Sequence, residues 1–310
     1  MQRIAIVHFA LLLAALALAY MLPFELLVLS YAILGPAHYL TEISWLHDRK
    51  YFLPERGVAG LLAIAALGMM FIASTFWYGV VVSYIFVICA IVAASPTRLR
   101  AMALIALATL SFAIAYQLDA PFAVIGVLLP TLAHVSLFTL VFMLLGAHKA
   151  RSPVQFALVA IYLLAVAAIL TFPPSQATVI PRLASFGQEY FGDVAPALGA
   201  MLGIADLKFD ARLTGVLSFI YTYHYLNWFI KADVVRWADV SRARLATIAG
   251  LSLGATGLYF YNYTYGFMVL VLLSLTHVLL EFPLNSISIR QLGTALRKDL
   301  TMSAGRRARA

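Results

Sequence analysis

Long apolar segments alternate with short polar connections along almost the whole chain. A helix needs ~17–25 residues to cross a bilayer, and lipid cannot satisfy backbone polar groups, so apolar runs of this length favour helices. The pattern predicts ten membrane-spanning helices, at residues 4–21, 24–46, 57–75, 77–94, 101–118, 122–147, 153–171, 212–231, 244–262 and 265–284. We therefore predict an all-α, polytopic integral membrane helical bundle, with residues 1–310 forming a single transmembrane domain.

The cations are distributed unevenly between the two sets of connections. They follow every second segment, as in Arg49, Lys50, Arg98, Arg100, Lys149, Arg151, Lys231, Arg236 and the tail from Arg297 to Arg309. The other connections are neutral or slightly acidic. Because Lys and Arg accumulate in cytoplasmic loops, this distribution predicts that both termini are cytoplasmic. We expect a multi-pass protein of the bacterial inner membrane.

The composition agrees with a membrane protein. The chain is 64% hydrophobic and only 11% charged, which is too apolar for a soluble globular domain. A formal net charge of +8 would suit nucleic acid, but the cations lie in short loops and in the tail, where anionic lipid accounts for them. The bilayer, and no nucleic acid, is the expected partner. Cys89 is the single cysteine, so disulfides and cysteine-ligated metal sites within one chain are excluded.

One connection is long, residues 172–211 on the predicted outer side. Phe172-Pro173-Pro174 at its start ends the preceding segment, because a residue before proline is disfavoured in a helix. Residues 188–204 are compatible with an amphipathic helix on the membrane surface. A plain surface loop and a lid over a lipid-facing cavity both stay open. At the end of the chain, residues 290–310 are predicted to form a basic cytoplasmic tail.

Four histidines lie deep within apolar segments: His38, His134, His224 and His277. Their segments are predicted to run in the same direction, and the histidines lie at comparable depths from the first cytoplasmic charge. Ionisable groups at such depth are costly and mark functional sites. Neutral imidazole binds iron, copper and zinc, and bundle cores commonly hold such metals. We predict one metal site formed by these histidines; the alternative is a set of hydrogen bonds between helices.

Two carboxylates accompany the deep histidines at helical spacing. Glu42 follows His38 by four residues, and Glu281 follows His277 by four, so each carboxylate can share a helix face with its histidine. The carboxylates either ligate the metal or accept the N–H of a ligating imidazole and thereby fix its tautomer. We favour the second role, because four histidines already provide a neutral ligand set. Asn227 is a further polar residue predicted in this site.

Aromatic residues and prolines lie close to the deep histidines in sequence. Tyr39, Tyr223 and Trp228 either line a channel for a flat apolar substrate or serve in packing alone. Pro36 and Pro130 each precede a deep histidine, where a proline frees a backbone carbonyl and bends the helix.

The remaining histidines are interpreted as lying outside the site. His47 and His148 adjoin charged residues at predicted helix ends, which is typical of the membrane interface. His8 lies one turn inside the first segment without an acidic neighbour, and we interpret it as a packing residue.

The run Gly35-Pro36-Ala37-His38-Tyr39-Leu40-Thr41-Glu42 resembles Gly-x-Pro-His-Gly-x-x-Asp, the first motif of the Brp/Blh family of membrane β-carotene dioxygenases. His134 and His224 match the second and third motifs, and Thr276-His277 through Glu281 matches the last. Order and spacing agree over most of the chain, with Trp228 in place of a second histidine. Members of this family split β-carotene centrally into two retinals with non-haem iron.

The resemblance implies an O₂-dependent oxygenase acting on a long apolar isoprenoid or lipid. Oxidative cleavage of a carotenoid to retinal-type aldehydes is the leading case. The implied cofactor is one non-haem Fe²⁺ on the deep histidines, and the implied partners are a hydrophobic lipid-like substrate and O₂. Two other classes stay open: a membrane electron-transfer protein with histidine-ligated haem, and a transporter with a His/Glu proton relay.

Overall fold

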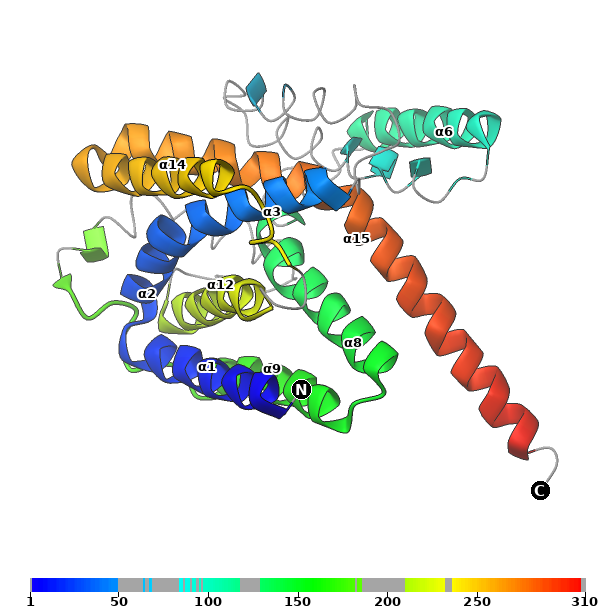
Figure 1. The fold of residues 1–310 in the computed structure, drawn as a ribbon, viewed down its shortest axis with the longest axis horizontal. Coiled ribbons are helices and arrows are strands. Elements are labelled where there is room, and N and C mark those ends of the chain that lie inside the picture. Colours follow the sequence, from blue (N-terminus) through cyan, green and yellow to red (C-terminus); the bar gives the residue numbers. More distant parts are fainter. Residues whose placement is uncertain are drawn as a thin grey trace.

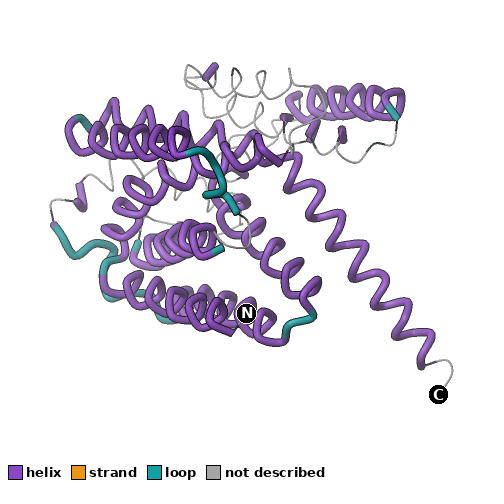
Figure 2. Tube along the Cα trace, in the orientation of Figure 1, coloured by secondary structure: helices purple, strands orange, loops and turns teal. Residues whose placement is uncertain are grey.

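Every regular element that the computed structural model describes is a helix (Figure 1). It describes residues 2–49, 97–117, 129–181, 183–185, 210–231 and 236–307, with short pieces between 64 and 95. The elements are α1 (Gln2–Met21), α2 (Pro23–Leu29), η1 (Ser30–Leu34), α3 (Gly35–Arg49), α6 (Arg98–Gln117), η2 (Leu129–Phe138), α8 (Thr139–Ala150), α9 (Pro153–Thr171), α12 (Ala211–Ile230), α14 (Arg242–Tyr261) and α15 (Tyr263–Arg307). Loops occupy short stretches between them (Figure 2). The prediction of an all-α protein is confirmed.

Several helices begin and end where the apolar segments do. The predicted span 153–171 coincides with α9, and 212–231 differs from α12 by one residue at each end. The span 244–262 corresponds to α14. The predicted spans 57–75 and 77–94 lie mostly outside the described residues, and the amphipathic helix predicted at 188–204 lies wholly outside them.

Three helical segments of the described part are long and apolar enough to cross a membrane: Pro23–Arg49, Pro153–Thr171 and Tyr265–Asp299. The stretches Ile6–Met21 and His134–Ala150 are apolar but shorter. These helices are those of a membrane protein. The count of ten spans and the cytoplasmic location of both termini stay predictions.

Helix α12 is the central element of the described bundle. It packs against α1, α2 and α9, and also against η1, η2 and α3. Phe219 on α12 belongs to the same apolar cluster as Phe24 of α2 and Tyr162 of α9. A helix that is buried around its whole circumference belongs to the core of a bundle. Polar side chains on α12 are therefore enclosed by the other helices.

Two π-helical segments accompany the deep histidines of α3 and η2. η1 joins α2 to α3, and the N–H of Gly35 donates to the carbonyl of Ser30, five residues back. η2 itself contains His134. A proline such as Pro36 or Pro130 removes a regular helical hydrogen bond, and a wider turn is one way in which the backbone adjusts. One inserted residue rotates all later side chains by ~100° about the helix axis, so these segments determine where the histidines point.

Two glycines allow close approaches that a side chain would prevent. A Cβ at Gly266 would lie 2.1 Å from the Cα of Tyr259, so this glycine permits the tight turn from α14 to α15. A Cβ at Gly35 would lie 3.0 Å from the hydroxyl of Tyr39. The aromatic ring of Tyr39 thus folds back over the start of its own helix.

Helix α15 is much longer than a membrane span. Its 45 residues extend ~68 Å at the usual rise, against a hydrocarbon core of ~30 Å. Figure 1 shows α15 running beside α14 and then changing direction, and Pro283 lies inside this helix. The predicted basic tail, residues 290–310, is helical as far as Arg307. Its first turn is held by Lys149 of α8, whose Nζ donates to Oε1 of Gln291 at 3.0 Å.

The start of the long connection after α9 is fixed to the first turn of α2. Oε1 of Glu25 accepts hydrogen bonds from the hydroxyl of Thr178 at 2.5 Å and from the N–H groups of Val179 and Ile180, each at 2.7 Å. The N–H of Phe24 also donates to a carbonyl of this loop. One carboxylate therefore replaces the backbone partners that the loop lacks.

Changing Glu25 to Ala should lower the free energy of unfolding by ~1–3 kcal/mol, because it leaves partly buried N–H groups without an acceptor. Glu25→Gln keeps an acceptor oxygen and should cost less. Denaturant unfolding of the detergent-purified protein measures both values. An Ala variant as stable as the parent chain would show that the carboxylate does not hold the loop.

Candidate metal centre

The four deep histidines meet at one point inside the bundle. His38 comes from α3, His134 from η2, His224 from α12 and His277 from α15, and their ligand nitrogens all lie within 4.8 Å of one another. Their rings form a closed circuit, with centroids 4.7–5.2 Å apart between neighbours. Three of the four are 1% exposed, and His224 is partly buried. The structure thus brings together every histidine that depth alone had selected.

The facing nitrogens are spaced like neighbouring ligands of one ion. Nε2 of His38 lies 3.1 Å from Nε2 of His224, and Nε2 of His134 lies 2.9 Å from Nε2 of His277. Nitrogens ~2.1 Å from an ion lie ~3.0 Å apart at a right angle and ~3.4 Å apart in a tetrahedron. The observed spacings therefore fit adjacent positions of a single coordination sphere.

Two of the opposite ring nitrogens, those of His277 and His224, are hydrogen-bonded to other groups. Nδ1 of His277 donates to the carbonyl of Ser274 at 2.6 Å, which leaves a lone pair on Nε2 of the neutral ring. Nδ1 of His224 shares a hydrogen bond of 2.7 Å with the hydroxyl of Thr139. Such partners fix the orientation and tautomer of ligating imidazoles. Thr139 and Ser274 have no special signal in the sequence and become recognisable only in the folded bundle.

The two carboxylates occupy different positions relative to the centre. Oε2 of Glu42 lies 3.1 Å from Nε2 of His38, the nitrogen that also faces the other imidazoles. Oε2 of Glu281 lies 2.8 Å from Nδ1 of His134, a nitrogen that faces away from the contact with His277. Glu281 thus lies beside the ring of a histidine from another element, where an acceptor for a ligating imidazole would lie. Glu42 instead lies where a direct ligand would.

Charge balance favours one ion in this centre. Oxygens of Glu42 and Glu281 and a nitrogen of His277 also lie within 4.8 Å of one another. Two ionised carboxylates in an apolar interior need nearby positive charge, since each would otherwise lose its hydration without compensation. One divalent cation among neutral imidazoles neutralises both carboxylates. A second would leave a double charge uncompensated.

Aromatic rings cover the centre on two sides. The ring of Tyr39 stacks on His277 at 4.4 Å, and its hydroxyl shares a hydrogen bond of 2.6 Å with that of Tyr225. The indole of Trp228 lies 5.7 Å from His38 and donates to the hydroxyl of Thr41 at 2.9 Å. These contacts place Tyr39 and Trp228 beside the centre.

The other predicted site residues lie farther into the helix packing. The ring of Tyr223 contacts Phe219 and Tyr162 in the apolar core. Asn227 is buried, and its Oδ1 has no hydrogen-bond partner among the described residues. Tyr225, next in sequence to His224, instead has its ring beside those of His224 and His38.

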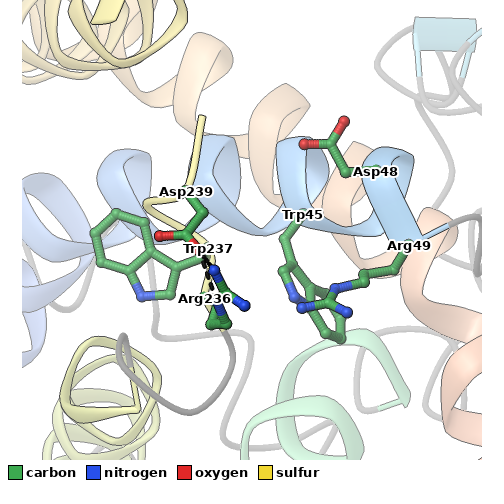
Figure 3. A pocket seen from close by; sticks show the side chains of 6 residues that line it. All are labelled: Trp45, Asp48, Arg49, Arg236, Trp237 and Asp239. Carbon is green, nitrogen blue, oxygen red and sulfur yellow. Dashed lines mark hydrogen bonds and ion pairs between the residues drawn. The ribbon is translucent and has the colours of Figure 1, made fainter. Parts of the chain in front are cut away.

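A pocket of about 230 Å³ lies at the end of α3. It is lined by Trp45, Asp48, Arg49, Arg236, Trp237 and Asp239 (Figure 3). Arg236 and Asp239 form an ion pair across its edge. The ring of Trp45 lies 5.5 Å from that of Trp228, which in turn contacts His38. Two indole rings therefore stand between this polar pocket and the metal centre.

Each of the four histidines should be needed for metal binding. Replacing any one of them by Ala should lower metal affinity by more than the ~10–100-fold that loss of an outer hydrogen bond costs. His8→Ala is the matched control, because His8 is also buried but lies on α1 outside the cluster. Elemental analysis of detergent-purified protein measures the bound metal. Stoichiometric metal in all four variants would refute the site.

The two glutamates should respond differently to neutral substitution. Glu281→Gln removes the charge opposite Nδ1 of His134 and should weaken metal binding by ~10–100-fold. Glu42→Gln places an amide beside the facing nitrogens and should approach the loss seen for His38→Ala. Metal titrations of both variants, with thermal unfolding as the check on folding, measure the difference. Equal and full metal retention in both would make the carboxylates structural.

No protein-family model, curated protein or solved structure matches this chain. The resemblance to the Brp/Blh family therefore stays an expectation based on the quoted residues. What can be said of the site rests on its geometry: a buried cluster of histidines and glutamates that can hold a metal ion.

Proposed function

We propose that this protein is a membrane oxygenase that uses one non-haem iron and O₂ to oxidise a long apolar isoprenoid or lipid. Oxidative cleavage of a carotenoid to retinal-type aldehydes is the leading case. The observation that carries the proposal is the convergence of four imidazoles and two carboxylates inside a bundle of apolar helices. Such a location suits a substrate that is dissolved in the bilayer.

The donor set suits a redox-active first-row metal. Imidazole ligands are shared by iron, copper, nickel and zinc, and carboxylate oxygens add preference for the harder ions. His38 and Glu42 present a nitrogen and an oxygen to the same centre. The single cysteine, Cys89, excludes a thiolate ligand set within one chain. Iron is the member of this group that the resemblance implies.

The surroundings of the centre suit a flat, conjugated substrate. The rings of Tyr39, Tyr225 and Trp228 surround the histidines with apolar, aromatic surface. Aromatic faces pack well against planar apolar chains and expose few polar atoms to them. Exclusion of water around the double bond that reacts also prevents side reactions.

The chemistry divides between cofactor and chain. A bound iron would supply the activation of O₂. The residues of the chain orient the imidazoles, through Ser274 on His277 and Glu281 beside His134. Cleavage of one C=C bond by one O₂ gives two carbonyl groups, so both oxygen atoms and all electrons are accounted for without an external reductant.

The geometry does not favour the haem alternative. Two axial ligands on opposite sides of a haem iron would have their nitrogens ~4 Å apart, with the porphyrin between them. The two pairs of Nε2 atoms in the centre are 2.9 and 3.1 Å apart, and ligand nitrogens of all four histidines lie within 4.8 Å of one another. Those imidazoles stand in the space that a porphyrin ring would need.

The test is oxygen-dependent conversion of carotenoid by the purified, iron-loaded protein. We expect O₂ uptake with β-carotene, appearance of aldehyde products in lipid extracts, and an optical spectrum without a Soret band. The His277→Ala variant should form no aldehyde, and lipid extracts of cells with and without the protein identify other substrates. A Soret band would indicate haem, and metal-independent flux driven by a pH gradient in proteoliposomes would indicate a transporter.

A further inference from the structure

A row of polar residues continues along α15 from the metal centre. Glu281, Asn285 and Ser288 are 2%, 0% and 4% exposed, and Gln291 follows at the surface. Their spacings of four, three and three residues place all of them on one face of the helix. We call these four residues the polar row. It begins beside the buried carboxylates and ends at an exposed side chain.

Asn285 lies in the middle of the polar row without partners. Neither its Oδ1 nor its Nδ2 makes a hydrogen bond with any described residue, although the side chain is completely buried. An amide buried in this way costs free energy for each group left unpaired. Buried polar groups without protein partners are usually satisfied by ordered water, which needs two to four polar neighbours.

The backbone supplies another acceptor on α15, six residues before Asn285. Pro283 has no N–H, so the carbonyl of Leu279, four residues earlier, lacks its usual helical donor. Such free carbonyls inside membrane helices are tolerated where water or a neighbouring side chain satisfies them. The proline is thus consistent with a wet interior at this point of α15.

The outer end of the polar row meets charged groups. Gln291 accepts a hydrogen bond from Lys149, and His148 lies 3.4 Å from Asp299, about two turns farther along α15. These side chains of α8 and α15 are exposed or partly exposed. The row therefore connects a dry, charged centre with an end of the bundle that water reaches.

We propose that the polar row holds a file of water molecules, which connects the carboxylates of the centre with the aqueous phase beside Lys149. Through this file, water and protons reach the centre without passing the rings of Tyr39 and Trp228. The path depends only on α15 and its neighbours, so it does not require that the proposed oxygenase activity is correct.

Hydroxyl-radical labelling by X-ray radiolysis tests the water file on the whole, metal-free protein in nanodiscs. Radicals form where water is bound, and phenylalanine rings report them. Phe282, beside the polar row, and Phe219, in the apolar core, are both 0% exposed. We expect Phe282 to be labelled several-fold faster than Phe219. Equal, slow labelling of both rings would overturn the proposal.

Two variants separate a water file from a general loosening of the helix. Asn285→Leu replaces the amide by an apolar group of similar size and should bring Phe282 labelling down to the rate of Phe219. Ser288→Ala should lower it partly, whereas Ser286→Ala should not, because the Ser286 hydroxyl already donates to the carbonyl of Phe282 at 2.9 Å. If the Asn285→Leu variant does not fold, the difference in Phe282 labelling between Ser288→Ala and Ser286→Ala tests the proposal.

Thermal unfolding gives an independent readout. If the row is dry, Asn285→Leu removes an unpaired amide and should raise the melting temperature while leaving labelling unchanged, which contradicts the proposal. If the amide binds water, the variant should gain little or lose stability. The labelling experiment uses metal-free protein and does not depend on oxygenase activity. Failure of the water-file proposal is therefore distinguishable from failure of the proposed function.

Discussion

The burial of two carboxylates among apolar helices is the constraint on which the rest of the structure depends. Glu42 and Glu281 are 3% and 2% exposed, and each lies at ion-pair distance from a buried imidazole. Burial of an isolated ion costs several kcal/mol even after the surroundings relax. A cation at the centre would compensate both carboxylates at once and would draw on four separate helical elements to do so. Metal binding would then be coupled to packing of the bundle, as in other buried metal sites.

That coupling explains why the helices at the centre are irregular. Four imidazoles must reach one point at nearly the same depth, and regular helices joined at fixed angles rarely achieve this. Pro36 and Pro130 accompany the π-helical segments, and Pro283 lies two residues after Glu281. Each irregularity changes the rotation or direction of a helix near a polar group of the site. Only α12, at the middle of the bundle, contributes its histidine from an unbroken helix.

The sequence predicted the ligands better than it predicted their contacts. Depth along apolar segments is a local property, so it selected the histidines that the fold brings together. The pairing of Glu281 with His134 is a tertiary contact, and the spacing to its own helix neighbour carried no information about it. Tyr223 and Tyr225 flank His224, and the sequence could not tell which of them faces the centre, because that depends on the rotation of α12. Fold class was predictable from composition; the rotation of each helix was not.

The proposed oxygenase would have to receive an apolar substrate and exchange charge with water at the same metal. One cavity serves both demands badly, because water that solvates the carboxylates would also hydrate the reacting bond. In this bundle the two demands fall at different levels along α15, because His277 and Glu281 lie one turn apart on the same face of the helix. The ring of Tyr39 stacks on His277. One turn later, Glu281 begins the polar row that leads to Asn285. The same helix thus separates the dry approach from the polar one, and its buried amide is costly unless that second approach is wet.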